Sequence, residues 1–578
     1  MAVSIIKKKY RPAAGVLLSA LLLSLAFPRY HRYRLALFAL VPLLIHTKTG
    51  TAKSTLRRFF LCGWLFHTIL LQWLWANIFW AGGWAVLAQQ GLCLILALFW
   101  LLPAGAWVYF RDAGGRYTTA IGFSCFWVGM ELLQARLFTG FGWSALGYTQ
   151  GANRYVAQFA SIGSVSLLSF FLVLINTLIA KIYTERQHFV LRILSVILLL
   201  GGLTAGGYFL FQEADYESLP LNAGIIQPNF SQEMKWDSDY YGEMLRKTGN
   251  LTQSLVNHKK ADIVIWPEAL LTVDYKIPLF HEALSDIART AGTYIFTGTV
   301  RDDPSTGDSY NSSVLFDPNG KEAGCYDKIR LAAFGEYIPL ENYIPFVSRI
   351  AFGGITAGKE QQVFSLHGRK LAPLICFEVL FGPMAETLRQ KGADALIVVT
   401  NLAWFGNSNA ILQELEIARM RAIETGLPLL HSANTGVSGV FDPYGRFHTV
   451  HHTVDSRGAL LDWTEKTQPE HVVMKRFVDA FPVAAPARRL LPGGPVFLPW
   501  LLFGLGFLLI AWRQFRQSSL FSLLEGETSE AQDVRESPAD SGSVSAGTQT
   551  GAKAKAKAPP KKKAAARKPA SKPKAKEE

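Results

Sequence analysis

The chain has 578 residues, of which 50% are hydrophobic and only 18% are charged, and its formal net charge is +14. Soluble proteins carry about 25% charged residues, so this composition argues against a purely soluble protein and indicates burial in a membrane. The positive charge is concentrated in residues 551–578, which hold eleven Lys or Arg and two Glu. The rest of the chain is nearly balanced, and we expect no nucleic-acid partner. The five cysteines form no CxxC pair, which argues against a zinc site and a disulfide scaffold.

Apolar runs dominate the first two hundred residues and return once near residue 500. Several reach the length of about 20 residues with which a helix crosses a bilayer. We therefore predict eight transmembrane helices, which are Ala13–Phe27, Leu35–Ile45, Phe59–Ala81, Trp84–Phe110, Thr118–Leu133, Val156–Ala180, Phe189–Phe211 and Val496–Trp512. The first two are short enough to be re-entrant segments or buried helices instead. The first also resembles a signal peptide, since it follows four basic residues and offers Ser24 and Ala26 as a cleavage pattern.

Basic residues flank these spans unevenly, with thirteen on the flanks that we assign to the inside and five on the outer flanks. By the positive-inside rule both termini are cytoplasmic, and the segment between the seventh and eighth spans faces outward. We expect an N-terminal transmembrane domain (1–211), an outward-facing domain (212–495), a last transmembrane helix (496–512) and a cytoplasmic tail (513–578). The tail is acidic and then rich in Lys, Ala and Pro, so it is expected to be disordered, with its basic end near the anionic inner leaflet.

The outward-facing domain has the pattern of an α/β fold. Short apolar runs rich in β-branched residues predict buried strands at Ala261–Trp266, Thr293–Val300, Leu371–Cys376 and Ala395–Thr400. Helical stretches are predicted between some of them, at Ser238–His258, Phe280–Thr290 and Ile411–Glu424.

Three separated segments carry one reactive side chain at or just beyond the end of a predicted strand: Glu268 in IVIWPE, Lys328 in YDKIR and Cys376 in LICFE. A carboxylate at a sheet edge suits general-base work, a lysine can stabilise an oxyanion or a thiolate, and a cysteine can be a nucleophile. Each also has an ordinary explanation: a helix-start carboxylate, a solvated Lys–Asp pair and a small core side chain. A disulfide between Cys325 and Cys376 is a further alternative, and it would silence the thiol.

In this order, the three motifs resemble the nitrilase, or carbon–nitrogen hydrolase, superfamily. Further matches are IQPN at 226–229, AWFG at 403–406 and NTGVSG at 434–439. The resemblance implies an αββα sandwich and a catalytic triad of Glu268, Lys328 and Cys376.

A nitrilase-like domain between membrane spans resembles the apolipoprotein N-acyltransferase family, up to about residue 512. The segments FGEYIPL at 334–340 and ARMRAIETG at 418–426 match that family closely. The resemblance implies transfer of a fatty acyl chain from a phospholipid, expected to be phosphatidylethanolamine, to the N-terminal amine of S-diacylglyceryl-cysteine of a lipoprotein. This step, the last of lipoprotein maturation, passes through a Cys376 thioester. The resemblance also implies a monomer in the bacterial inner membrane, a periplasmic catalytic domain, and neither cofactor nor metal.

The same resemblance suggests supporting residues. We expect Glu336 and Glu378 to orient Lys328, with Phe377 beside the nucleophile. The residues expected to bind substrate are aromatic, and they are Trp143, Tyr148, Trp236, Trp404 and Phe405. Trp236 falls on the family's mobile loop over the active site, whereas an interfacial aromatic belt is an alternative for Trp143 and Tyr148.

Five positions depart from the family pattern. Gly142, Phe377, Leu402, Glu414 and His431 stand where Pro, Tyr, Asp, His and Arg are usual. None of them removes a member of the expected triad, but Leu402 and His431 leave the degree of activity and the substrate preference open.

Two other functions fit parts of the pattern. A membrane-tethered amidase or nitrilase would let water resolve the thioester, although one span would suffice as its tether. A transporter or receptor with a silent nitrilase-like domain would work without Cys376. Few charges lie within the predicted spans, with Glu131 the main exception, which argues against a transport path.

Overall fold

The computed structural model describes residues 2–30, 32–78, 82–113, 115–211, 217–333, 335–337, 354–455, 459–462 and 472–517. Residues 1–513 form one compact unit, which joins the membrane helices and the α/β domain, and residues 514–578 form a second. The tail expected to be disordered lies, from residue 518 onward, outside the described residues.

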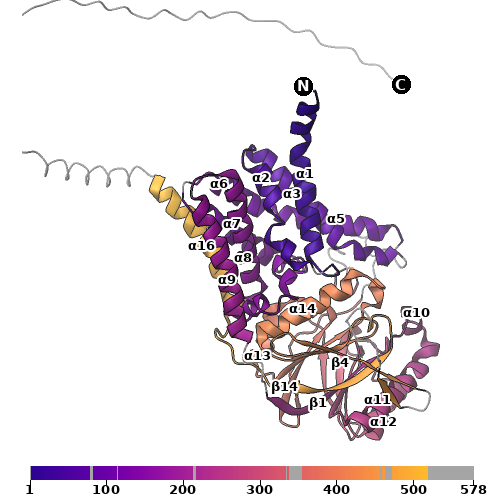
Figure 1. The fold of residues 1–578 in the computed structure, drawn as a ribbon. Helices are drawn as coiled ribbons and strands as arrows, with labels where there is room; N and C mark the ends of the chain where they lie inside the picture. Colours follow the sequence, from indigo (N-terminus) through magenta and orange to yellow (C-terminus); the bar gives the residue numbers. More distant parts are fainter. Residues whose placement is uncertain are drawn as a thin grey trace, which may run out of the picture. The chain divides into compact units, whose positions relative to one another are not determined.

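The N-terminal part is helical, and α7 packs between α6 and α8 (Figure 1). Its elements are α1 (Ala2–Ala26), η1 (Tyr33–Leu37), α2 (Val41–Thr47), α3 (Ala52–Leu70), η2 (Gln72–Asn77), α5 (Trp84–Phe99), α6 (Leu101–Phe110), α7 (Thr118–Gln134), η3 (Leu146–Gln150), η4 (Val156–Phe159), α8 (Ala160–Thr184) and α9 (Phe189–Phe211). One more long helix, α16 (Gly494–Gln517), follows the α/β domain.

Four helical segments are long and apolar enough to cross a membrane, judged by length and composition. They are Trp84–Phe110, Val156–Thr184, Phe189–Phe211 and Gly494–Arg516, and they coincide with four of the predicted spans. Two shorter apolar helices, Ala13–Ala26 and Tyr33–Thr47, coincide with the two spans whose length left their nature open. The full count of eight remains a prediction.

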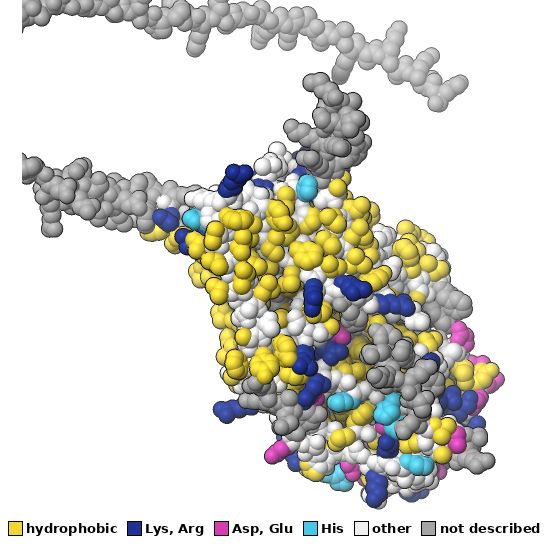
Figure 2. All heavy atoms as spheres, in the orientation of Figure 1, with side chains coloured by type: hydrophobic (Ala, Val, Ile, Leu, Met, Phe, Trp, Pro, Cys, Tyr) yellow, Lys and Arg dark blue, Asp and Glu magenta, His cyan; other side chains and the backbone are white. Residues whose placement is uncertain are grey.

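Hydrophobic side chains cover much of the helical part, whereas charged side chains gather lower in the view (Figure 2). On α9, Val190, Ile197 and Leu198 are each at least 59% exposed, and on α16 the same holds for Leu501 and Leu508. Exposed apolar surface of this extent is unfavourable in water and favourable in lipid. The outer faces of α9 and α16 are therefore suited to contact acyl chains.

The α/β domain contains two sheets. The first has the order β13-β12-β14-β1-β2-β3-β4-β5 and the second β11-β10-β9-β8-β7-β6. Their strands are β1 (Ser218–Gln227), β2 (Ile263–Ile265), β3 (Tyr294–Asp303), β4 (Asp308–Phe316), β5 (Glu322–Asp327), β6 (Phe364–Leu366), β7 (Arg369–Ile375), β8 (Ala395–Thr400), β9 (Leu429–Ala433), β10 (Gly439–Phe441), β11 (Phe447–Thr449), β12 (His452–Val454), β13 (Leu460–Asp462) and β14 (Phe477–Ala484). The centre of each sheet is parallel, β1-β2-β3 in one and β7-β8-β9 in the other.

Successive side chains of the strands face opposite sides of their sheet, as expected for a four-layer sandwich. In β2, Ile263 and Ile265 belong to the core between the sheets, whereas Val264 packs on the opposite side under the helices. Ser432 links the sheets directly, since its Oγ lies 3.1 Å from the Ile226 carbonyl oxygen and 3.3 Å from that of Ile265. The arrangement confirms the expected αββα sandwich.

Helices cover both outer faces of this sandwich. The helices of the domain are α10 (Gln232–Lys235), η5 (Ser238–Tyr240), α11 (Tyr241–Lys259), α12 (Pro278–Ala291), η7 (Cys376–Leu380), α13 (Gly382–Gln390), η8 (Leu402–Phe405) and α14 (Asn409–Thr425). The first sheet is covered by α11 and α12, and α14 packs on β9 of the second sheet and on α8 (Figure 1). The four strands and three helices predicted in this domain are confirmed, with shifts of a few residues at their ends.

Gln413 of α14 joins the sandwich to the membrane helices. Its Oε1 accepts hydrogen bonds from the indole nitrogens of Trp73 (3.1 Å) and Trp143 (2.6 Å). Its Nε2 donates to the carbonyl oxygens of Pro28 (3.2 Å) and Leu70 (3.4 Å). Because these groups are buried, the hydrogen bonds also satisfy indole N–H groups that would otherwise lack a partner.

Candidate active site

Glu268 follows β2 in a turn that lies against β3. A Cβ at Gly298 of β3 would stand 2.5 Å from the Cα of Glu268, so only glycine allows this approach. Two hydrogen bonds hold the turn to Gly298, one from its N–H to the Pro267 carbonyl (3.2 Å) and one to its carbonyl from the Leu270 N–H (2.9 Å). The Glu268 side chain is consequently fixed and buried, at 6% exposure.

Lys328 follows β5, and its ammonium group lies between two carboxylates. Its Nζ is 3.3 Å from Glu268 Oε1 and 2.9 Å from Glu336 Oε2. Asn311 of β4 closes the group, since its Nδ2 donates to Glu268 Oε1 (2.9 Å) and to Glu336 Oε1 (2.6 Å). We call these four residues the lysine cluster. The expected contact of Glu336 with Lys328 is present.

Cys376 stands where β7 ends and η7 begins. Its φ angle is +50°, in the left-handed region that residues other than glycine adopt only at a cost of about 1–3 kcal/mol. The sharp turn directs the Cys376 side chain out of the sheet at the carboxyl end of the parallel strands, where Thr400 of β8 contacts the thiol. Cys325 is free and lies in the other sheet, so the alternative of a Cys325–Cys376 disulfide is wrong.

Glu378 positions the segments that carry the lysine and the cysteine. Its carboxylate accepts hydrogen bonds from the N–H groups of Ile375 (2.8 Å), Ile329 (2.8 Å) and Arg330 (3.1 Å), and from the hydroxyl of Tyr326 (2.8 and 2.9 Å). Ile375 directly precedes Cys376, and Ile329 directly follows Lys328. Glu378 therefore acts on Lys328 through the main chain rather than by direct contact.

Burial and charge decide the protonation of this group. Burial raises the pKa of the Cys376 thiol well above its usual value; the Glu268 charge raises it further, and Lys328 opposes the rise. For Lys328, burial acts to lower the pKa, but Glu336 and Glu268 hold it well above the usual value. The resting arrangement is a neutral thiol beside a full ammonium charge, and a thiolate forms only if a base removes the proton.

A second buried pair, Glu414 and His431, lies near Cys376, since Thr400 contacts both the thiol and Glu414. Glu414 Oε1 accepts a hydrogen bond from Thr400 (3.0 Å), and its Oε2 stands 4.0 Å from His431 Nε2. Those two facing atoms have no hydrogen-bond partner among the described residues. Burial raises the pKa of Glu414 to about 8 and lowers the pKa of His431 to about 4, so both are neutral near pH 7. We call them the histidine pair.

The aromatic residues expected to bind substrate fall into separate groups. Trp236, 55% exposed, lies 6.2 Å from the Trp404 ring, and Phe405 contacts Trp73 at 4.7 Å. Trp143 and Tyr148 are buried rather than exposed as an interfacial belt would be. Trp143 bonds to Gln413, and the Tyr148 hydroxyl accepts a hydrogen bond from Arg421 (3.2 Å). Phe377 packs near Phe141, with ring centres 6.5 Å apart. Their role in binding remains a prediction.

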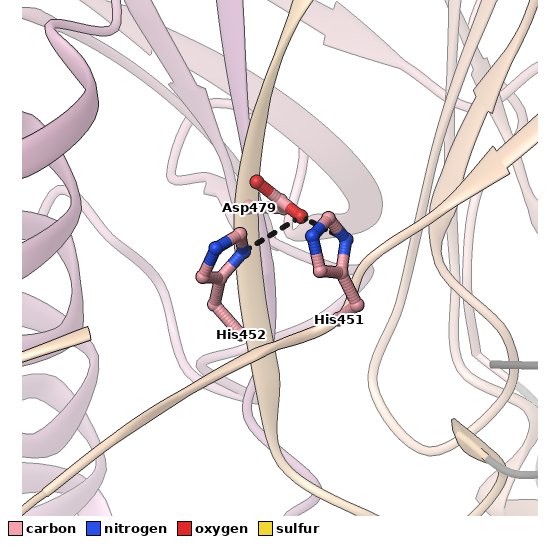
Figure 3. Close-up of side chains that lie close together, drawn as sticks. All are labelled: His451, His452 and Asp479. Atoms are coloured by element: carbon pink, nitrogen blue, oxygen red, sulfur yellow. Dashed lines mark hydrogen bonds and ion pairs between the residues drawn. The ribbon is translucent and has the colours of Figure 1, made fainter. Parts of the chain in front are cut away.

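Among the described residues, one group of side chains has the composition of a metal site. His451 Nδ1 and His452 Nδ1 both face Asp479 Oδ2, at 2.7 and 2.9 Å (Figure 3). These separations are hydrogen-bond lengths, shorter than the spacing of about 3.3 Å between ligands that stand about 2.0 Å from a tetrahedral ion. The contacts are explained as a clamp between the start of β12 and β14.

Sequence reasoning missed two residues, Asn311 and Lys235. Asn311 lies in a strand of mixed polar residues, DSYNSSVLF, where nothing local distinguishes it from its neighbours. Lys235 directly precedes Trp236, and a basic residue beside that tryptophan was the one available signal. Glu414 and His431 were noticed only as departures, and their proximity could not be foreseen.

Comparison with known proteins identifies both halves of the chain. Residues 223–453 match the family model "Carbon-nitrogen hydrolase", and residues 19–178 match "Apolipoprotein N-acyltransferase N-terminal domain". Among solved structures, a mutant of the amidase from Nesterenkonia sp. AN1 is 17% identical, with 45% of this chain and 92% of the amidase covered and a TM-score of 0.33. A nitrilase-superfamily protein from Saccharomyces cerevisiae is also 17% identical, with 46% and 90% covered and a TM-score of 0.34.

Relatives that match over most of their length share one description, "Apolipoprotein N-acyltransferase". The protein from Haemophilus influenzae is 31% identical over 458 residues, which are 76% of this chain and 86% of the relative. The one from Sinorhizobium medicae is 32% identical over 400 residues (66% and 73%), and that from Geobacter metallireducens is 29% identical over 440 residues (74% and 84%). The chain belongs to the apolipoprotein N-acyltransferase family.

Proposed function

We propose that this protein transfers a fatty acyl chain from a phospholipid to the N-terminal amine of S-diacylglyceryl-cysteine in lipoproteins, through a thioester on Cys376. The observation that carries the proposal is the meeting of the buried Glu268 and Lys328 with the half-buried Cys376, within a chain that belongs to this family. Phosphatidylethanolamine is the proposed donor. The proposed setting is a monomer in the inner membrane, with a periplasmic catalytic domain and cytoplasmic termini.

In the first half-reaction, Glu268 accepts the thiol proton and the Cys376 sulfur attacks the ester carbonyl of the phospholipid. Negative charge develops on the carbonyl oxygen, and the Lys328 ammonium stabilises it. The ester C–O bond breaks, the leaving lysophospholipid oxygen takes the proton from Glu268, and an acyl thioester remains. Glu268 is needed because burial keeps the thiol protonated, with its pKa well above the usual value.

In the second half-reaction, the free amine of the lipoprotein cysteine attacks the thioester. Glu268 takes the proton that the amine loses, an amide bond forms, and the C–S bond breaks. Proton transfer from Glu268 to the departing sulfur restores the thiol. Glu336 and Asn311 keep Lys328 and Glu268 in place through both steps, since each contacts the Glu268–Lys328 pair directly.

The membrane helices offer the apolar surface that such substrates require. Both donor and acceptor are lipids, and the outer faces of α9 and α16 are apolar, as lipid contact requires. A water-soluble amidase would need no such surface.

Intact-protein mass spectrometry tests the proposal. The full-length protein is incubated with phosphatidylethanolamine in detergent micelles, beside Cys376→Ala and a matched control, Cys325→Ala. We expect one fatty-acyl mass on the wild type and on Cys325→Ala that hydroxylamine removes, and none on Cys376→Ala. Transfer of the label to a diacylated lipopeptide identifies an acyltransferase. Release of free fatty acid without transfer would instead identify a hydrolase, and the absence of any adduct would contradict the proposed donor chemistry.

A further inference from the structure

A second lysine is buried beside the proposed active site. Lys235, the last residue of α10, is 1% exposed, although lysine is almost never fully buried unless it is paired. The following residue, Trp236, is 55% exposed. Neighbouring side chains thus point in opposite directions, and burial of the lysine holds this end of α10 against the domain.

Two hydrogen bonds connect Lys235 to the segment that begins with Glu268. Its Nζ donates to the main-chain oxygen of Glu268 at 3.0 Å. Its own carbonyl oxygen accepts a hydrogen bond from Thr272 Oγ1 at 2.5 Å, and the hydroxyls of Thr272 and Tyr241 lie 2.8 Å apart. Displacement of Lys235 would therefore move both the main chain at Glu268 and the start of the exposed tryptophan segment.

The charge of Lys235 also acts on the reacting groups. Burial lowers the pKa of this lysine to about 7, and the negative charges of Glu268 and of the Cys376 thiolate act to raise it. The other charged or titratable groups that act on Cys376 are Lys328 and Glu414. An ammonium group has three N–H donors, and the hydrogen bond to Glu268 is the one that Lys235 Nζ makes among the described residues.

We propose that Lys235 is a positioning residue for acyl transfer, which fixes the main chain at Glu268 and supplies a second buried positive charge when the Cys376 thiolate forms. The lysine cluster alone holds two carboxylates against one ammonium, so a thiolate would add a third negative charge to one buried group. Lys235 balances part of that charge. The statement about acyl transfer rests on the proposed function, whereas the statement about the thiolate does not.

The test compares Lys235→Met, which removes the charge and the hydrogen bond, with Lys235→Gln, which keeps a donor but loses the charge. Lys321→Met, at an exposed turn between β4 and β5, is the matched control. The first readout is the rate of Cys376 alkylation by iodoacetamide against pH, located by peptide mass spectrometry to separate it from Cys325. We expect alkylation at pH 7 to slow about fivefold in both Lys235 variants and to stay unchanged in the control, and we expect the difference to vanish well above pH 7, where Lys235 is neutral.

The second readout is the rate of acyl-enzyme formation from phosphatidylethanolamine in detergent micelles. We expect it to fall about tenfold in Lys235→Gln and further in Lys235→Met, because only the latter also loses the hydrogen bond. Folded variants whose alkylation rate at pH 7 equals that of the wild type would overturn the proposal, whatever their acylation rates. If Lys235→Met does not fold, the alkylation of Lys235→Gln alone tests the proposal. Alkylation needs no lipid, so failure of the wild type to accept an acyl group would remove the proposed function and leave this test in force.

Discussion

Two buried polar groups act on Cys376, and they are built in opposite ways. In the lysine cluster, each charged side chain has a partner of opposite charge and a hydrogen bond within 3.3 Å. In the histidine pair, Glu414 Oε2 and His431 Nε2 face each other at 4.0 Å, and neither has a hydrogen bond among the described residues.

The difference shows which interactions keep a buried side chain charged in this protein. Both groups are desolvated, but the carboxylates around Lys328 hold its pKa well above the usual value, whereas burial leaves Glu414 and His431 neutral near pH 7. A buried charge persists only where partners replace the water that it loses. The lysine cluster is therefore suited to stabilise charge during a reaction. The histidine pair, being neutral, adds no charge near the thiol.

The largest effect is expected from Lys328→Met, which removes the cation of the lysine cluster. Two buried carboxylates then lose their partner, so we expect acyl-enzyme formation to fall about a thousandfold and the protein to lose about 3–5 kcal/mol of stability. Single-turnover mass spectrometry and thermal unfolding measure the two quantities, with Lys321→Met as control. A variant that reacts within a factor of about ten of the wild type would contradict the role of this cluster.

Asn311→Leu weakens the same cluster without removing a charge. Glu268 and Glu336 each lose a donor, at 2.9 and 2.6 Å, and such a loss costs about 1–3 kcal/mol per buried group. We expect acylation between about tenfold and a hundredfold slower, measured by the same assay, and a lower unfolding temperature. Asn257→Leu, at an exposed position of α11, should leave both unchanged. Equal acylation rates and unfolding temperatures in the two variants would contradict the role of Asn311 in the lysine cluster.

Glu414→Gln tests the neutral state of the histidine pair. Burial raises the pKa of Glu414 from its usual 4.5 to about 8. Between these values the unfolded chain loses the proton while the folded protein keeps it, so wild-type stability falls as pH rises towards 8. The glutamine variant has no such proton. Its unfolding temperature should therefore rise relative to the wild type between about pH 5 and pH 8, and the difference should be constant at higher pH.

The same substitution should change the pH profile of acylation. Above about pH 8 the ionised Glu414 opposes formation of the Cys376 thiolate in the wild type, because its charge raises the thiol pKa. We expect a decline of the wild-type rate there that Glu414→Gln lacks. Glu282→Gln, at an exposed position of α12, is the control. Parallel profiles for wild type and Glu414→Gln would show that Glu414 is already ionised in the folded protein.

The smallest effect is expected from Tyr326→Phe. The hydroxyl bonds to both oxygens of Glu378, but three main-chain N–H groups also hold that carboxylate. Stability should fall by about 1 kcal/mol and the acylation rate should change little. Urea unfolding measures the first and the mass-spectrometric assay the second, with the half-buried Tyr294→Phe for comparison. A rate loss as large as that of Asn311→Leu would place Tyr326 in the reaction itself.

Hydrophobic patterning was enough to predict much of this architecture. Continuous apolar runs predicted eight membrane helices, four of which coincide with long apolar helices of the structure, and short β-branched runs indicated strands such as β8, whose bounds Ala395–Thr400 match the prediction. The apolar pattern that predicts such an element lies within the segment itself, so it can be read without knowledge of the rest of the fold. The order of Glu268, Lys328 and Cys376 was likewise visible in the sequence, because Glu268 and Cys376 each follow an apolar run and Lys328 lies in the motif YDK.

Only the tertiary structure decided which other polar residues join these three. Lys235 is 33 residues from Glu268, Asn311 is 25 residues from Glu336, and Glu414 meets His431 across a helix and the following strand. Such meetings depend on strand register and on where loops close, which no local pattern records. The protonation of each group then follows from its burial and its partners, so the chemistry of the site appears only when the chain has folded.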